Sequence, residues 1–140
     1  MTRITMALIT WNDSFSVNVA EIDKQHQSLV QMMNELHDAM RQGKGKNVEG
    51  QIIAELVRYT VTHFNKEEKY FDQFGYPEKE SHKKEHTYFV KKVSDFKNGF
   101  DEGRLGLSVQ VMNFLSDWLQ KHIKGTDKKY SHFFNEKGLK

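Results

Sequence analysis

Histidine and carboxylate side chains recur in this 140-residue sequence at spacings that suit metal binding. His63 and Glu67 are four residues apart, and so are His82 and His86, so each pair projects from one face of a helix. Because the chain has no cysteine, thiolate metal sites, disulfides and cysteine nucleophiles are all excluded. Any bound metal must therefore be held by imidazole and carboxylate groups.

The histidines continue apolar stripes of helical period in four segments of the chain. In each segment, apolar residues recur every three or four positions, and histidine occupies positions that complete the stripe. The four stripes are Val19, Ile22, His26, Leu29, Met33, Leu36 and Met40; Ile53, Leu56, Thr60, His63, Glu67, Tyr70 and Phe74; His82, His86, Phe89, Val93, Phe96 and Phe100; and Val111, Leu115, Trp118 and His122. Each stripe therefore predicts an amphipathic helix.

Short connections that contain glycine separate these segments, at residues 43–45, 75–77 and 103–106. Four helices with short connections predict an all-α protein, an antiparallel up-down-up-down four-helix bundle that forms one domain over residues 1–140. The residues before Val17 mix turn formers with aromatics and predict an irregular N-terminal arm. The last part of the chain, about residues 128–136, predicts a short C-terminal helix or a packed tail.

The histidines are expected to meet at one end of this bundle. The start of the first helix, the end of the second, the start of the third and the end of the fourth lie at the same end of an up-down-up-down arrangement. Since the stripes face inward and the positions along the axis agree, five imidazoles should form one buried layer. They belong to His26, His63, His82, His86 and His122.

Two carboxylates are expected to join the imidazole layer. We choose Glu67 because Glu68, one position further on, would point away from the stripe. Asp127 follows His122 by five residues, a spacing that an ideal helix would splay by about 140°. Gly125 lies between them, and we expect the helix to end there so that Asp127 turns back toward the core.

A metal site would compensate for the cost of burying these groups, which otherwise amounts to several kcal/mol of desolvation. Imidazole and carboxylate ligands without thiolate suit iron, manganese, zinc or copper. Two six-coordinate ions offer about twelve positions. The five histidines, two bridging carboxylates and one oxo or hydroxo bridge leave one position open, on the ion with two histidines. Such a vacancy suits a small ligand that binds end-on.

The candidate ligands and the residues around them resemble the hemerythrin family, in particular its bacterial single-domain members. The resemblance covers most of the chain, from the aromatic arm to about Tyr130. Its elements are Trp11, Val17-x-Val19-x-x-Ile22-Asp23-x-Gln25-His26, His63-x-x-x-Glu67, Phe74-Gly-Tyr-Pro77, His82-x-x-x-His86 and Trp118-Leu-x-x-His122-Ile-x-x-x-Asp127. The four ligand elements, which carry His26, His63 and Glu67, His82 and His86, and His122 and Asp127, occur in the family's order and on the predicted helices.

The resemblance implies a hemerythrin-like domain that binds O2 reversibly at two non-haem iron ions joined by an oxo or hydroxo bridge. O2 would take the vacant position while both ferrous ions are oxidised, for oxygen carriage, storage or sensing. By position, one iron would be held by His82, His86 and His122, the other by His26 and His63, with Glu67 and Asp127 bridging them.

Composition excludes several other classes of protein. A mean hydropathy of −0.74 and the lack of a long apolar run argue against membrane insertion. The net charge of +2, from 21 basic and 19 acidic residues, gives no electrostatic reason to bind nucleic acid. The first ten residues lack a convincing secretory signal, so a cytoplasmic protein is expected. The sequence indicates dioxygen as a partner and leaves any protein partner open.

Two further functions stay open. One is a di-iron enzyme on the same scaffold that reduces peroxide or nitric oxide, or a protein of iron handling or repair. The other is a helical interaction module whose polar layer holds no metal. We favour binding over catalysis, and so predict no enzyme, because oxygen-activating ferritin-like sites use Glu-x-x-His motifs, and this sequence contains none.

Four residues near the predicted site allow two interpretations each. Trp11 either covers the ligand pocket from the arm or packs against the bundle end. Asp23 either supports a ligand or is a favourable charge in the first turn of a helix. His37 lies one position off the first stripe and His132 lies in the tail, so both are expected to be structural or solvated.

Overall fold

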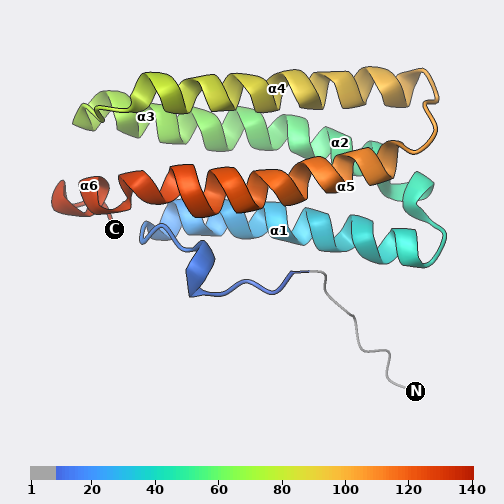
Figure 1. Cartoon of the computed structure of the whole chain (residues 1–140), viewed down its shortest axis with the longest axis horizontal. Helices are drawn as coiled ribbons and strands as arrows, with labels where there is room; N and C mark the ends of the chain where they lie inside the picture. Colours follow the sequence, from blue (N-terminus) through green and yellow to red (C-terminus); the bar gives the residue numbers. More distant parts are fainter. Residues whose placement is uncertain (1–8) are drawn as a thin grey trace.

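Four antiparallel helical rods run side by side along the protein (Figure 1). The computed structural model describes residues 9–140, and no strand occurs within that range. The first rod is α1 (Ala20–Arg41), and the third is α4 (Lys79–Asp101). The second rod joins α2 (Gly45–Tyr59), the π-helix η2 (Thr60–Phe64) and α3 (Asn65–Phe74). The fourth joins α5 (Leu107–Trp118), the π-helix η3 (Leu119–Thr126), the 3-10 helix η4 (Asp127–Tyr130) and α6 (Ser131–Glu136). The predicted all-α, up-down-up-down bundle is confirmed.

The reversal between the second and third rods fixes where the third begins. α3 ends at Gly75, whose φ of +70° is left-handed, a conformation that glycine adopts without steric cost. The backbone N–H of Tyr76 then donates to the Phe71 carbonyl at 2.9 Å. Pro77 follows in the turn, and α4 starts two residues later. The first turns of α4 consequently lie beside the end of α3.

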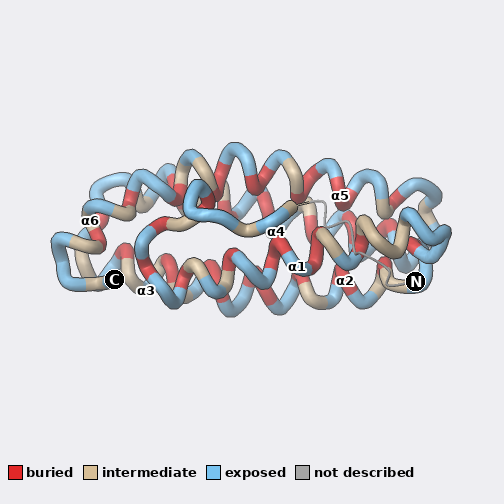
Figure 2. The backbone as a smooth tube through the Cα atoms, turned by 90° about the horizontal axis from the view of Figure 1, so that it is seen from below, coloured by how far each residue is buried: buried red, intermediate tan, exposed pale blue. Residues whose placement is uncertain are grey.

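The interior contains two apolar clusters. Buried residues line the inward faces of the rods (Figure 2). The larger, which we call the main cluster, includes Leu29, Leu36, Leu56, Phe64, Phe89, Phe96, Leu115 and Trp118. The smaller, the end cluster, consists of Val17, Val19, Ile22, Phe71, Tyr76, Tyr130 and Phe134. Histidines contact both: His122 stacks on Trp118, and His82 stacks on Tyr130. The imidazole layer therefore lies between two apolar regions.

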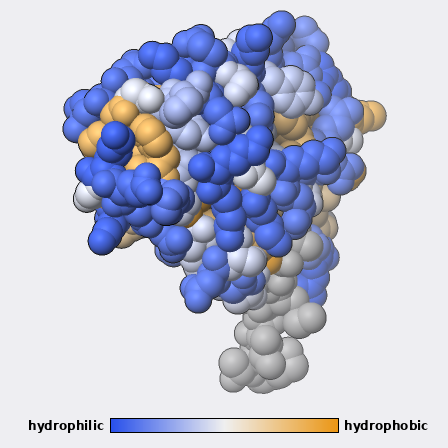
Figure 3. All heavy atoms as spheres, turned by 60° about the vertical axis from the view of Figure 1, so that its left-hand side comes forward, coloured by the Kyte–Doolittle hydropathy of each residue, from blue (hydrophilic) through white to orange (hydrophobic). Residues whose placement is uncertain are grey.

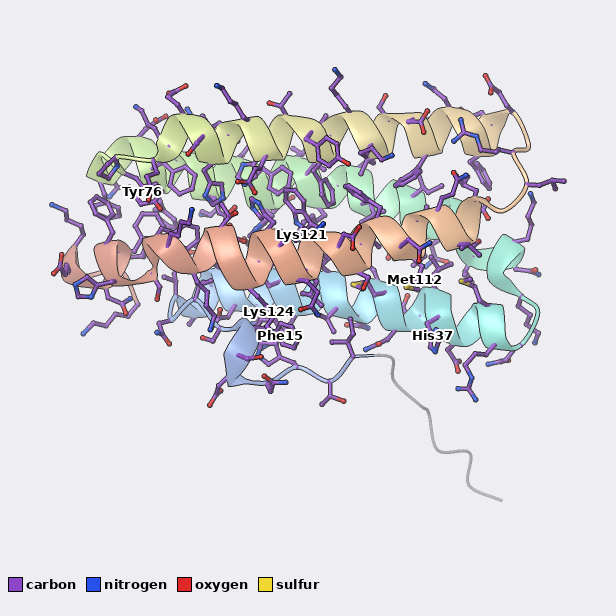
Figure 4. All side chains as sticks on the ribbon, viewed as in Figure 1. Phe15, His37, Tyr76, Met112, Lys121 and Lys124 are labelled. Carbon is purple, nitrogen blue, oxygen red and sulfur yellow. The ribbon has the colours of Figure 1, made fainter. Side chains whose placement is uncertain are left out.

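The N-terminal arm packs along the bundle. It contains one short 3-10 helix, η1 (Asp13–Phe15), as expected for an irregular segment. Phe15 is buried in the main cluster, and the Lys124 ammonium lies 5.1 Å from its ring centroid (Figure 4). Half-buried Trp11 lies 5.4 Å from the same ring and packs against the main cluster beside Val30 of α1. Trp11 thus covers the side of α1, and both interpretations of it are wrong.

Asp23 stabilises the start of α1. Its carboxylate accepts a hydrogen bond from the backbone N–H of Val17 at 2.8 Å and one from the Ser16 hydroxyl at 2.5 Å. Asn18, between them and the helix, has a φ of 58°, which tightens the entry into α1. Asp23 is therefore a first-turn charge whose two carboxylate oxygens hold the arm rather than an imidazole of the layer.

One residue of the predicted stripes is exposed, and three more, Met40, Tyr70 and Phe74, are only half-buried. The third stripe predicts Phe100 in the core, but this residue is 39% exposed, because it lies in the last turn of α4 with its ring over Gly50, where a Cβ would come within 2.6 Å. The face that carries the α6 end is mostly hydrophilic (Figure 3). None of the helices in residues 9–140 combines the length and apolarity needed to cross a bilayer. The interpretation of the first ten residues falls mainly on residues 1–8, outside the described range.

Candidate metal centre

The second rod supplies one imidazole and one carboxylate. His63 lies in the π-helix η2, and Glu67 lies in the first turn of α3. His63 Nε2 is 3.3 Å from Glu67 Oε1, as expected for an i,i+4 pair on one face. A π-helical turn admits one extra residue and rotates the residues after it around the helix axis. η2 therefore shifts which residues of the second rod face inward at the level of these two side chains.

The third rod brings two imidazoles to the same carboxylates. His86 Nε2 lies 3.1 Å from Glu67 Oε1, and His82 Nε2 lies 2.8 Å from Asp127 Oδ1. Since both histidines lie in the first turns of α4, the Gly75 reversal places them opposite the end of the second rod.

In the fourth rod, His122 and Asp127 face the same way although they are five residues apart, and the helix does not break between them. η3 is π-helical from Leu119 to Thr126, so residues five apart lie roughly one wide turn apart there. His122 Nε2 consequently lies 3.0 Å from Asp127 Oδ1, and both side chains face inward. The prediction that the helix ends at Gly125 is wrong, because the wider turn passes through this residue and continues into η4.

The first rod completes the layer. His26 Nε2 lies 3.0 Å from Asp127 Oδ2 and 3.1 Å from His63 Nε2. All seven residues chosen from the sequence thus meet at one level of the bundle, and none is more than 2% exposed. His132 is exposed beside Glu136, and neither it nor His37 belongs to the clustered ligand atoms.

The seven side chains form two groups, each able to hold one metal ion. Within each group, one ligand atom from every residue lies within 4.8 Å of the others. One group contains Glu67, His82, His86, His122 and Asp127, and the other contains His26, His63, Glu67 and Asp127. The two carboxylates belong to both groups, which is the arrangement that bridging ligands require.

The buried donor atoms fit metal ions better than they fit one another. Several imidazole nitrogens and carboxylate oxygens lie within ion-pair distance, yet within residues 9–140 they make no hydrogen bond of good geometry. They are Glu67 Oε1, His82 Nε2, His86 Nε2, His122 Nε2, Asp127 Oδ1 and Asp127 Oδ2. Unsatisfied buried polar groups are costly, and one metal ion in each group would satisfy these atoms. The donor set, nitrogen and oxygen without sulfur, suits iron.

Three of the histidines are oriented from outside by a polar neighbour on Nδ1. The Gln25 side-chain oxygen lies 2.6 Å from His63 Nδ1, a Glu68 oxygen 2.8 Å from His86 Nδ1, and a Glu85 oxygen 2.7 Å from His122 Nδ1. When Nδ1–H donates to such a partner, Nε2 keeps its lone pair free for a metal. Thr126 also donates to Glu85, at 2.9 Å.

Sequence reasoning missed these outer partners, although one signal points to them. Gln25 precedes His26, Glu68 follows Glu67, and Glu85 precedes His86. A residue one position from an inward-facing one is rotated by about 100° around its helix, toward the neighbouring rod. Each of the three thereby reaches the histidine of the next helix.

Electrostatics within the layer favour ionised carboxylates. Burial and the Asp127 charge raise the pKa of Glu67, but the imidazoles of His63 and His86 outweigh them and leave it well below its usual value. The pKa of Asp127 is lowered in the same way. Burial raises this pKa, but His122 and the other imidazoles beside Asp127 outweigh burial and hold it well below its usual value. Two anionic carboxylates in the centre of the layer are what a pair of cations needs.

The pKa values of the imidazoles shift in different directions. Burial lowers the pKa of His63, and the Glu67 charge does not fully compensate. Burial also lowers the pKa of His122, but Asp127 and Glu85 on its two nitrogens outweigh burial and raise this pKa to about 9. Without metal, His122 is therefore protonated at neutral pH.

Aromatic rings surround the polar layer. Phe64 stacks on His86 with ring centroids 3.8 Å apart, and Trp118 stacks on His122 at the same distance. Buried Tyr130 donates its hydroxyl to Glu67, a contact that the sequence did not predict. The apolar residues expected to exclude water are all buried: Ile22, Leu29, Phe89, Leu115, Trp118 and Ile123. The layer is consequently shielded from bulk solvent.

A helical bundle with this shared cluster of imidazoles and carboxylates defines a class of metal-binding protein. Similarity to proteins of known family identifies that class. The family model for the hemerythrin HHE cation binding domain matches residues 17–133. The chain therefore belongs to the hemerythrin family.

Individual proteins show the same relationship. The chain is 36% identical over 126 residues to a bacteriohemerythrin from Stenotrophomonas maltophilia, covering 90% of this chain and 81% of that protein. It is 38% identical over 125 residues to a bacteriohemerythrin from Pseudomonas aeruginosa, covering 89% and 80%. The crystal structure of a wild-type hemerythrin is similar, with a TM-score of 0.81 and 34% identity, covering 90% of this chain and 97% of that chain.

Proposed function

We propose that this protein binds O2 reversibly at a non-haem di-iron centre. The observation that carries the proposal is the buried pair of ligand groups that share Glu67 and Asp127. Family membership supports the same function. When bound, a ferrous pair supplies the two electrons that O2 binding requires, and the protein supplies the ligands and a dry enclosure.

We propose an assignment of ligands that the two groups support. One iron would be held by His82, His86 and His122 and the other by His26 and His63, with Glu67 and Asp127 shared between them. By the ligand count, the ion with two histidines would keep an open position for the ligand. Glu68 and Glu85 orient histidines of the first group, whereas the neutral Gln25 orients His63.

The surroundings favour binding over turnover. The layer lies between two apolar clusters, and its residues are nearly inaccessible to water. A dry enclosure limits the proton delivery on which oxygen reduction depends. With five imidazoles and only two carboxylates, the site carries little negative charge to stabilise high-valent iron. We therefore propose that the protein is not an enzyme.

Two measurements on purified protein test this function. Iron analysis should give two irons per chain, and clearly fewer would favour the metal-free interaction module. The ferrous protein should then develop a visible absorption band under O2 that fades on deoxygenation over several cycles. Irreversible conversion to the ferric form in the first exposure, with consumption of peroxide or nitric oxide, would favour the enzyme.

Two expectations stay predictions. Limited proteolysis that leaves one protected fragment would support a single domain over residues 1–140. Fractionation of the source cells would test the cytoplasmic location. Neither outcome affects the assignment of the metal ligands.

A further inference from the structure

Tyr59 lies directly beside the two-histidine group. It is the last residue of α2, one helical turn before His63, and its ring stacks on that imidazole with centroids 4.8 Å apart and planes 21° apart. Across the core its ring contacts Phe64 and Phe89, with centroids at 5.9 and 6.1 Å. The ring therefore lies between His63 and the apolar interior of the main cluster.

One edge of this tyrosine closes a groove between the first and second rods. The groove has a volume of about 430 Å³, and Gln25, Met32, Tyr59 and His63 are among its lining residues. Tyr59 is only 6% exposed there. The groove thus borders His63 of the two-histidine group and the Tyr59 ring that stacks on it.

The Tyr59 hydroxyl differs from those of three other tyrosines near the bundle end. Tyr130 donates to Glu67, Tyr70 donates to Glu21, and Tyr76 donates to Glu78. The Tyr59 oxygen is buried and has no hydrogen-bond partner within residues 9–140. A buried hydroxyl without a partner costs free energy, so its presence beside a ligand group needs an explanation.

The chemistry of the phenol makes this hydroxyl a donor. An ordinary phenol, with a pKa of about 10, keeps its proton at neutral pH. A protonated phenol near two carboxylates can donate to an electron-rich group but cannot itself supply an anionic ligand.

We propose that the Tyr59 hydroxyl donates a hydrogen bond to the small ligand held in the open position beside His63. This inference rests on the proposed function, since it needs the vacancy on the ion with two histidines. The ligands favoured would be those that carry negative charge on the atom facing the hydroxyl, such as reduced dioxygen or azide. Tyr59 would then determine ligand selectivity while leaving the iron ligands unchanged.

The variant Tyr59→Phe removes only the hydroxyl, and Tyr88→Phe is the matched control because Tyr88 is 55% exposed on α4. Each iron-loaded protein is titrated with azide in the diferric state, and the rate of O2 release is measured from the O2-bound form prepared from ferrous protein. We expect Tyr59→Phe to weaken azide binding and to speed O2 release by about tenfold, the effect of losing one such hydrogen bond. Tyr88→Phe should match the wild type.

A second readout uses the metal-free chains. Phenylalanine in place of an unpartnered hydroxyl should leave resistance to urea equal or higher. Wild-type azide affinity and O2 release in Tyr59→Phe would overturn the inference, and so would a clear loss of urea resistance, which would indicate a structural partner. If instead the wild-type protein binds no iron, the proposed function itself fails, and this inference fails with it.

Discussion

At the scale of single residues, each ring nitrogen of His122 lies beside a different carboxylate. His122 faces Glu85 with Nδ1 and Asp127 with Nε2, at 2.7 and 3.0 Å. The outer contact fixes the ring, and the inner contact marks where a metal would bind. A single substitution here should therefore affect both metal content and stability.

We expect His122→Ala to reduce bound iron from two ions per chain to one or none. It should also destabilise the fold by ~3 kcal/mol, because the buried Asp127 loses one of its three imidazole neighbours and is poorly compensated. His132→Ala is the control, since that side chain is 85% exposed. Iron analysis and urea unfolding measure both effects. Two irons and intact O2 binding in His122→Ala would show that the ligand assignment is wrong.

The raised pKa of His122 predicts how the metal-free protein responds to pH. Its pKa is about 9 in the folded chain and about 6.5 in the unfolded chain, so the stabilisation is fully present below pH 6.5 and is lost as the pH rises through 9. His86, whose pKa is also raised, acts in the same direction. Urea unfolding of metal-free protein between pH 6.5 and 9 should show falling stability. A flat or rising profile would contradict the charged His122.

At the scale of helices, two π-helical segments position the ligands. η2 contains His63, and η3 contains His122 and leads directly into Asp127. Wide turns of this kind are rare and occur frequently at functional sites, because they re-aim side chains without ending a helix. The path of the backbone through Gly125 can be tested separately from metal binding.

Gly125→Ala distinguishes a continuous wide turn from a helix that ends at this residue. In the structure Gly125 has no left-handed φ, and an added Cβ would meet nothing within 4 Å. Alanine should therefore raise the free energy of unfolding by about 0.5–1 kcal/mol, with iron binding unchanged. Gly75→Ala, at a φ of +70°, should lower it by about 1 kcal/mol. Equal destabilisation by both variants would restore the helix end that the sequence suggested.

The difference between α-helical and π-helical turns explains which parts of the site could be predicted from the sequence. The pairs His63–Glu67 and His82–His86 follow the regular period, so spacing alone placed them on one face. The spacing of His122 and Asp127 revealed a departure from that period but not its form, because a π-turn has no single residue as its signature. The roles of Gln25 and Tyr59 were not predicted. They depend on the contact of each residue with His63, and the period of a single helix does not show which side chains meet.

At the scale of the whole molecule, the metal layer connects all four rods. The ligand groups draw one or two side chains from each rod and lie between the main cluster and the end cluster. The α6 end beyond the layer is held by the smaller cluster (Figure 1). Without metal, that end depends on few apolar residues and on a layer of unsatisfied polar atoms.

Removing iron should therefore destabilise the end of the bundle that carries α6 before the rest. Metal binding contributes to folding when its ligands come from separate elements. We expect hydrogen exchange in the iron-free protein to accelerate most in α6 and in the first turns of α4, with little change at the far ends of α1 and α5. Uniform acceleration along all four rods, or none, would contradict this arrangement.

Anomalous diffraction at the iron edge tests the central claim most directly. Crystals of iron-loaded protein with bound azide should show two iron peaks, one at His82, His86 and His122 and one at His26 and His63, with Glu67 and Asp127 between them. Azide should bind only at the second peak. A single peak, iron elsewhere in the bundle, or azide on the three-histidine ion would contradict the account.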